Sequence, residues 1–223
     1  MQQLKLFAID IDGVLLKDTF SPVLREIVLK HGGSYTAEIE RNVFSRNQLE
    51  AASYLAQKLA LDLPLQSLIS EYFSLRDDYL KFHDGGLIDG ALDMLSRLAS
   101  FGIPMICYGG LERSRIDVSF AECEKYLDRY ICTNEIRPGM KEICAGYRLK
   151  PSEVLFVDDV ATVAETCHTL EAGFVGLPPS HAWGWQRQAM QTAGVRYCLT
   201  HPDEITHVLI EEIDRNITSC FYR

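Results

Sequence analysis

Short apolar runs, each bounded by polar or glycine residues, recur along the chain. The first covers residues 4–9. It is too short for an amphipathic helix but apolar enough for a buried parallel strand. Five similar runs follow, at residues 103–108, 130–133, 154–157, 174–177 and 196–199. The hydrophobic pattern therefore predicts six strands.

Helix-length segments separate most of these runs. Residues 90–101 carry leucines three positions apart and stop at Gly102, and another segment opens at Pro138. Proline at the start and glycine after the end are typical of helix boundaries. Because strands and helices alternate, we predict an α/β fold with a Rossmann-like core, in which helices cover both faces of a parallel sheet.

One long interval breaks this alternation. Residues 17–83 contain no convincing strand, and their apolar residues are spaced by three and four, as on one face of a helix. A compact inserted unit explains this length better than an irregular loop does. We expect an inserted helical cap domain at residues 17–83, and a Rossmann-like catalytic core at residues 1–16 and 84–223.

Composition and charge narrow the function. The 223 residues are 47% hydrophobic and have a formal net charge of −9, with no cluster of basic residues. We therefore expect no nucleic-acid partner. The chain shows no secretory signal and no apolar stretch of the ~20 residues that span a bilayer, so we expect no membrane association and a cytoplasmic protein. Its seven cysteines include no C-x-x-C pair and are expected to be reduced. A homodimer is left open.

Paired carboxylates follow two of the predicted strands. Asp10 and Asp12 come after the first run, with Gly13 allowing a sharp turn, and Asp158 and Asp159 come after the run at residues 154–157. Parallel strands deliver their carboxyl ends to one edge of the sheet, so the four side chains are expected to converge there. Converging carboxylates call for a cation, and oxygen-only ligands favour Mg²⁺.

These motifs resemble those of the haloacid dehalogenase superfamily, in its helical-capped subgroup. The stretch "DIDGVL" is similar to the first family motif, D-x-D-G-[TV], and "LFVDD" is similar to the fourth. The resemblance implies that Asp10 is a nucleophile and that Asp12 is a general acid and base. It also implies that Mg²⁺ is bound by Asp10, the backbone carbonyl of Asp12 and the last acid pair. In that pair Asp159 is the direct ligand and Asp158 acts through water.

The chain departs from the family pattern at three places. Tyr108 stands where a serine or threonine usually ends the second motif, so we expect the backbone N–H groups of Gly109 and Gly110, at a helix start, to bind phosphate. The third motif should offer a lysine, and the candidates are Arg137, which we prefer, and Lys141. Val163 occupies a position that usually carries an acid or amide.

The function that the resemblance implies is a Mg²⁺-dependent phosphatase acting on a small phosphorylated molecule through an aspartyl-phosphate intermediate. A phosphomutase would use the same residues. A catalytically inactive binding or regulatory protein is the alternative that the three departures favour. Dehalogenation is disfavoured because it needs neither Asp12 nor a metal. A phosphonatase would need a Schiff-base lysine in the cap, where the candidates are Lys17, Lys30, Lys58 and Lys81.

Overall fold

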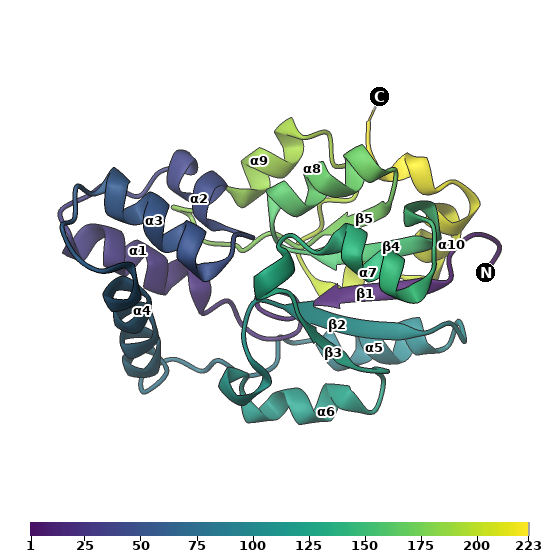
Figure 1. Ribbon diagram of the computed structural model, residues 1–223. Helices are drawn as coiled ribbons and strands as arrows, with labels where there is room; N and C mark the ends of the chain where they lie inside the picture. Colours follow the sequence, from purple (N-terminus) through teal and green to yellow (C-terminus); the bar gives the residue numbers. More distant parts are fainter. Residues whose placement is uncertain (223) are drawn as a thin grey trace.

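The centre of the molecule is a five-stranded parallel sheet. A computed structural model describes residues 1–222 (Figure 1). The strands are β1 (Leu6–Asp10), β2 (Met105–Gly109), β3 (Tyr130–Cys132), β4 (Val154–Asp158) and β5 (Gly173–Gly176), in the order β3-β2-β1-β4-β5. All residues of β1, β2, β4 and β5 are buried, which explains their continuous apolar sequences. The α/β fold with a Rossmann-like core is thus confirmed.

The sixth predicted strand is wrong. The segment at residues 196–199 runs beside β5, but it makes only an isolated bridge, through hydrogen bonds between the Gly176 N–H and the Tyr197 carbonyl and between the Leu199 N–H and the Gly176 carbonyl. The chain then turns away into helix α10 (His207–Arg215). A short apolar run in the sequence does not by itself show how many of its residues pair with the neighbouring strand.

Helices cover both faces of the sheet. The core helices are α5 (Ala91–Ala99), α6 (Ala121–Glu124), α7 (Met140–Tyr147), α8 (Ala161–Leu170), α9 (Gln186–Thr192) and α10 (His207–Arg215). Figure 1 shows α5 and α6 on one side of the sheet and α7 and α8 on the other. Right-handed crossovers produce this division, because the chain moves outward from β1 to β3 and then returns to build β4 and β5 on the opposite side.

The strand order reverses between β1 and β4. The register pairs Ile9 with Val157, so Asp10 at the end of β1 lies beside Asp158 at the end of β4. On its other side, Asp10 pairs with Tyr108 of β2. Open α/β sheets bind ligands outside the carboxyl ends of the strands at such a reversal.

Four helices form a separate layer beyond this edge of the sheet (Figure 1). They are α1 (Phe20–Lys30), α2 (Ala37–Val43), α3 (Gln48–Lys58) and α4 (Leu65–Tyr79), and we call them the cap. Polar side chains start three of them: the Asp18 carboxylate accepts from the first N–H groups of α1, and Thr36 and Asn47 cap α2 and α3. The inserted helical cap predicted from the sequence is confirmed as part of the fold.

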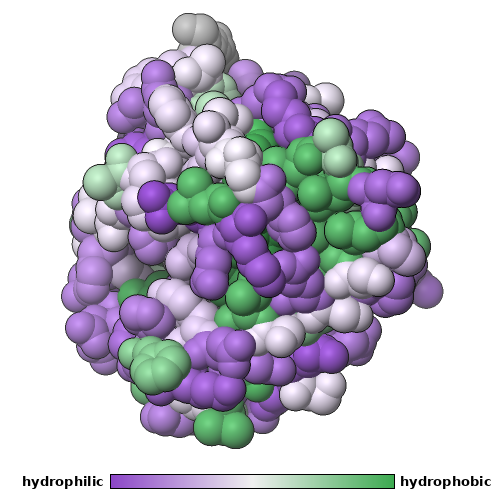
Figure 2. All heavy atoms as spheres, turned by 90° about the vertical axis from the view of Figure 1, so that its left-hand side faces the viewer, coloured by the Kyte–Doolittle hydropathy of each residue, from purple (hydrophilic) through white to green (hydrophobic). Residues whose placement is uncertain are grey.

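The cap has an apolar cluster of its own. Val23, Leu24, Ile27, Phe44, Leu55 and Leu68 are among the buried side chains that pack together there, apart from the cluster around the sheet. Figure 2 views the molecule from the cap side and shows a mostly hydrophilic face interrupted by apolar groups. No helix within residues 1–222 has the length and apolar character needed to cross a membrane.

Candidate active site

Four carboxylates meet at the reversal point of the sheet. Asp10 and Asp158 end β1 and β4, while Asp12 and Asp159 lie in the loops that follow. Asp10 and Asp159 are only 7% and 5% exposed. Gly13 permits this crowding, since its φ is +90° and any Cβ at this position would overlap the Asp159 carboxylate. The sequence motif D-x-D-G therefore brings the first acid pair against the second.

The charges of these groups oppose one another. Burial, followed by repulsion from Asp158, raises the pKa of Asp10 well above its ordinary value, although Arg137 acts against this shift. Burial and the neighbouring carboxylates of Asp158, Asp10, Asp18 and Asp12 likewise raise the pKa of Asp159 well above its ordinary value. Such a cluster becomes stable in its ionised form only when positive charge is brought to it.

Asp158 is held by hydrogen bonds within the core. The Tyr108 hydroxyl, which is fully buried, donates to Asp158 Oδ2 at 2.5 Å, and the Val160 N–H donates to Oδ1 at 2.8 Å. Burial raises the pKa of Asp158 to about 6, and the Tyr108 hydrogen bond limits that rise. Tyr108 thus turns towards the carboxylate instead of offering its hydroxyl to a ligand as a serine or threonine in the second motif would.

Asp12 faces the cap. Burial is the main reason that its pKa rises to about 7, and the charge of Asp18 adds to the rise, whereas Arg76 and Thr19 oppose it. Thr19 contacts the Asp12 carboxylate through its N–H and its hydroxyl at 3.4 Å. A carboxyl group with a pKa near neutrality is suited to give and take a proton at physiological pH.

Arg76 brings a cap helix to this end of the site. This side chain of α4 is 6% exposed, and its Nε donates to Thr19 Oγ1 at 3.0 Å while its Nη1 donates to the Arg115 carbonyl at 3.2 Å. Sequence reasoning missed Arg76. A signal was present, because Arg76 continues the apolar stripe of Tyr72 and Phe73 at helical spacing and so places a charge on the buried face of the helix.

Of the two predicted cations, the structure brings only Arg137 to the carboxylates. Its guanidinium lies against Gly110, where a Cβ would overlap Nη2, and its charge acts on both Asp10 and Asp158. The buried Nε of Arg137 has no hydrogen-bond partner within residues 1–222. Lys141 is exposed on α7 and does not line the cavity described below.

The surroundings of the two predicted phosphate-binding glycines differ from expectation. Both Gly109 and Gly110 line the cavity, but no α-helix starts there. The chain instead enters a loop and a short 3₁₀ turn at Arg113–Arg115, because the Gly109 carbonyl accepts hydrogen bonds from the N–H and hydroxyl of Thr133. Any contribution of these two residues to anion binding comes from loop N–H groups without a helix dipole. Val163, the third departure, is fully buried in α8.

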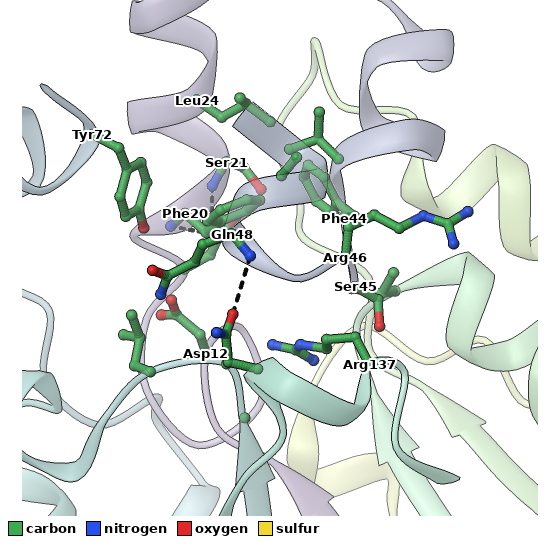
Figure 3. Close-up of a pocket in the computed structure, with 18 of the residues that line it drawn as sticks. Asp12, Phe20, Ser21, Leu24, Phe44, Ser45, Arg46, Gln48, Tyr72 and Arg137 are labelled. Atoms are coloured by element: carbon green, nitrogen blue, oxygen red, sulfur yellow. Dashed lines mark hydrogen bonds between the residues drawn. The ribbon is translucent and has the colours of Figure 1, made fainter. Parts of the chain in front are cut away.

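A cavity of about 150 Å³ connects the carboxylates to the cap. Asp10, Asp12, Asp159 and Arg137 line its floor, and side chains of α1, α3, α4 and the segment between α2 and α3 form its walls. Figure 3 shows the Tyr72 hydroxyl directed towards Asp12 and shows Ser45 beside Arg137. The cap therefore encloses the space into which a group bound at Asp10 would extend.

The donor set fits a hard divalent cation. Within residues 1–222, no three Asp, Glu, His or Cys side chains are grouped as a preformed metal site. Two carboxylates are sufficient for Mg²⁺, which keeps water and substrate oxygens as its other ligands. Asp10 and Asp159 are available for this role, whereas both oxygens of Asp158 already accept hydrogen bonds.

The four candidate Schiff-base lysines lie outside the cavity. Lys17, Lys30, Lys58 and Lys81 each form an ion pair with a carboxylate, and their side chains are 37% to 64% exposed. None of them lines the cavity. The phosphonatase alternative therefore lacks a nucleophilic amine at this site.

Comparisons with known proteins agree with this architecture. No protein-family model matches the sequence, and no curated protein is a significant match. Among solved structures, β-phosphoglucomutase from Clostridium difficile has a TM-score of 0.70 at 12% identity, over 97% of this chain and 99% of that one. A predicted phosphoglycolate phosphatase from Haemophilus somnus has a TM-score of 0.67 at 12% identity, over 95% and 99%.

A third solved structure was obtained with ligands. A HAD family hydrolase from Deinococcus radiodurans with bound phosphate and sodium has a TM-score of 0.61 at 18% identity, over 95% of this chain and 97% of that one. These similarities confirm the resemblance to haloacid dehalogenase-like proteins at the level of the fold, including the helical cap.

Proposed function

We propose that the protein is a divalent-cation-dependent phosphatase that hydrolyses a small phosphate monoester through an aspartyl-phosphate intermediate. The observation that carries this proposal is the arrangement of Asp10, Asp12 and Arg137 around the floor of one cavity, with Asp159 next to Asp10. A nucleophile, a proton donor and a cation are the groups that phosphoryl transfer to a carboxylate requires.

In the first step, an Asp10 oxygen attacks the substrate phosphorus, and the bond from phosphorus to the ester oxygen breaks. Asp12, whose pKa is raised to about 7 by burial and by Asp18, gives its proton to the departing oxygen. In the second step, Asp12 takes a proton from water as the water attacks the acyl phosphate, so that phosphate leaves and Asp10 is restored. One group can serve both steps because both of its protonation states are populated near neutral pH.

Arg137 is the cation proposed to hold the phosphoryl group. Its buried Nε lacks a partner, and its charge already acts on Asp10. The planar guanidinium can donate two parallel hydrogen bonds to phosphate oxygens, which a lysine ammonium cannot do. Arg137 would thereby reduce the repulsion between the Asp10 carboxylate and the incoming dianion.

The metal ligands proposed are Asp10, Asp159 and the backbone carbonyl of Asp12, with Asp158 acting through water. When bound, Mg²⁺ supplies positive charge between carboxylates and phosphate. Asp158 keeps its position through Tyr108 and the Val160 N–H. Such outer contacts fix the loop that carries Asp159.

Two alternatives use the same fold. A phosphomutase would return the phosphoryl group to its product, and the similar solved structures include proteins named as β-phosphoglucomutases. An inactive regulatory protein is the other, motivated by Tyr108, Arg137 and Val163 in place of the usual residues. We favour an active enzyme over the regulatory alternative because the four aspartates lie together and Arg137 provides the charge that a lysine would. Release of phosphate to water separates the phosphatase from the phosphomutase.

The proposal also divides the chain into two domains. Residues 17–83 are assigned to the cap, and residues 1–16 and 84–223 to the catalytic core. The two crossings between them lie side by side, since the Lys17 N–H donates to the Gly86 carbonyl and the Lys17 ammonium pairs with Asp84 at 2.5 Å. A cytoplasmic location is proposed with them, because all seven cysteines are free thiols.

Phosphate release tests the proposal. We expect the wild type to hydrolyse para-nitrophenyl phosphate with Mg²⁺ and to lose this activity with a chelator. Asp10→Asn should be inactive at unchanged thermal stability or better, because an amide cannot attack phosphorus and one charge leaves a repulsive cluster. Asp62→Asn, on an exposed cap loop, is the matched control and should remain active. Full activity of Asp10→Asn would exclude the mechanism.

A further inference from the structure

Most of the cavity wall that the cap forms is apolar, although Ser21, Arg46 and Gln48 line it as well. Beyond the carboxylates, its lining includes the cap side chains Phe20, Leu24, Phe44, Leu55, Leu68 and Ile69. The volume is about 150 Å³. A cavity of this size has room for a benzene-sized group.

Aromatic contacts hold these walls in place. The rings of Phe20 and Phe44 meet edge to face at 5.1 Å between centroids, and Phe20 lies 5.6 Å from Tyr72. Side chains packed in this way keep their rotamers. The cavity is therefore a shaped pocket and not a loose space between two domains.

The polar atoms gather at the opposite end, close to the carboxylates. The buried hydroxyls of Tyr72 and Ser45 and the Nε of Arg137 have no hydrogen-bond partner within residues 1–222. Figure 3 shows the Tyr72 hydroxyl and the Gln48 amide directed towards Asp12, with Ser45 next to Arg137. A buried polar atom without a hydrogen-bond partner costs free energy, so we expect atoms of a bound ligand to supply the missing hydrogen bonds.

Ser45 gives a second sign that this end is built for a ligand. Its φ is +55°, in the left-handed region that disfavours residues with a Cβ, and it joins α2 to α3. A strained residue with an unpartnered buried hydroxyl is typical of a binding site. The neighbouring Arg46 also lines the cavity, but it is exposed and its side chain points away from Asp12 in Figure 3.

We infer that the cavity selects phosphate monoesters whose leaving group is small and apolar, about the size of one six-membered ring, and that it rejects polyhydroxylated sugar phosphates. This inference rests on the proposed phosphatase function. The unpartnered polar atoms meet the phosphoryl group and the ester oxygen, and the apolar walls meet the remainder of the leaving group. A sugar would place several hydroxyls against those walls, where they would lose water without gaining partners.

A matched pair of esters tests this selectivity. Cyclohexylmethyl phosphate and glucose 6-phosphate both carry a primary phosphate ester on a six-membered ring, and they differ mainly in the hydroxyls. We expect kcat/KM for the cyclohexylmethyl ester to be higher by about 100-fold or more. Equal values, or a preference for glucose 6-phosphate, would overturn the inference while leaving the phosphatase intact.

A pair of variants locates the selectivity in the cavity. Leu24→Gln places an amide in the apolar wall, and Leu29→Gln makes the same change on the exposed side of α1, where Leu29 is 46% exposed. We expect Leu24→Gln to lower kcat/KM roughly 10-fold more for the cyclohexylmethyl ester than for glucose 6-phosphate. Leu29→Gln should change neither. An equal loss for both esters would argue against the apolar wall as the selective element.

A binding measurement on the wild type tests the ligand preference separately from catalysis. It requires no variant to fold. 2-Cyclohexylethylphosphonate, in which a CH2 group replaces the ester oxygen of cyclohexylmethyl phosphate, cannot be hydrolysed. Calorimetry should show that the wild type binds it more tightly than the phosphonate of glucose 6-phosphate that carries the same replacement. Preferential binding without phosphate release from either ester would contradict the phosphatase and support the ligand class. If neither phosphonate binds, the inference fails.

Discussion

At the scale of residues, the structure explains how Arg137 fits at the place where the third motif of the resembled family has a lysine. Arg137 reaches Asp10 because Gly110 leaves room for its guanidinium, whereas Lys141 lies on the solvent side of α7. A guanidinium needs more lateral space than an ammonium, and a glycine opposite provides it. The change therefore keeps a positive charge beside Asp10 and alters its shape.

This placement predicts different effects for the two cations. Arg137→Ala should weaken the binding of beryllofluoride with Mg²⁺, a mimic of the acyl phosphate, by about 10- to 100-fold, because charge-assisted hydrogen bonds of ~1.5–3 kcal/mol are lost. Lys141→Ala is the matched control and should bind as the wild type does. Calorimetric titration measures both. The reverse result would assign the motif to Lys141.

Tyr108 illustrates a residue whose role the sequence did not reveal. The sequence predicts that the Tyr108 hydroxyl does not replace the serine or threonine hydroxyl of the second motif, but it does not predict the hydrogen bond to Asp158. That contact joins β2 to β4 across β1. It depends on how the Tyr108 ring packs in the core, where it meets Phe156 edge to face at 6.0 Å between centroids. Only packed coordinates decide which carboxylate a buried hydroxyl reaches.

At the scale of elements, the start of the chain depends on the last core helix. Asp214 of α10 accepts hydrogen bonds from the backbone N–H groups of Gln2, Gln3 and Leu4 at 2.6 to 2.9 Å. Burial opposes the charge of Asp214, but these N–H groups outweigh it and lower its pKa below the ordinary 3.8. The contact fixes the segment that enters β1, and with it the position of Asp10.

Asp214→Asn should therefore destabilise the fold by about 1–3 kcal/mol at pH 7. A carboxyl whose pKa is lowered in the folded state stabilises it above the unfolded pKa, and this contribution is lost as the pH falls through the folded value. The difference from the wild type should thus shrink below the ordinary pKa of 3.8. Urea unfolding at several pH values measures it, with Glu211→Gln on the exposed face of α10 as control. A difference that does not vary with pH would show that the charge of Asp214 is not involved.

The sequence predicts the buried strands, because their apolar residues are continuous. It does not predict features that depend on tertiary contacts, such as the extent of strand pairing or the face of a helix that meets the site. The strands β1 and β4 could be placed because buried runs end abruptly at Asp10 and Asp158. The segment at residues 196–199 has a similar composition but forms only a bridge. Arg76 could not be assigned a role, because the face of α4 that meets the site depends on how the cap docks.

At the scale of the whole molecule, polar contacts hold the cap over the sheet on several sides. The Arg76 guanidinium reaches the Arg115 carbonyl on one side, and the buried Glu40 carboxylate accepts from the Gln186 amide at 2.8 Å on another. Gln186 Oε1 in turn accepts from the Ala161 N–H, which follows the loop of Asp158 and Asp159. The position of the cap is thus linked to the carboxylate site, in keeping with a cavity that both units complete.

The central claim is that a phosphoryl group is transferred to Asp10, and trapping that intermediate tests it most directly. Asp12→Asn lacks the base that activates water, a loss that typically costs ~10²- to 10⁴-fold, so the acyl phosphate should accumulate with para-nitrophenyl phosphate and Mg²⁺. Acid quenching and peptide mass spectrometry should find one phosphoryl group on Asp10 in this variant. In the double variant Asp10→Asn with Asp12→Asn, the modification should be absent. A phosphoryl group on another residue, or turnover without any covalent intermediate, would contradict the mechanism.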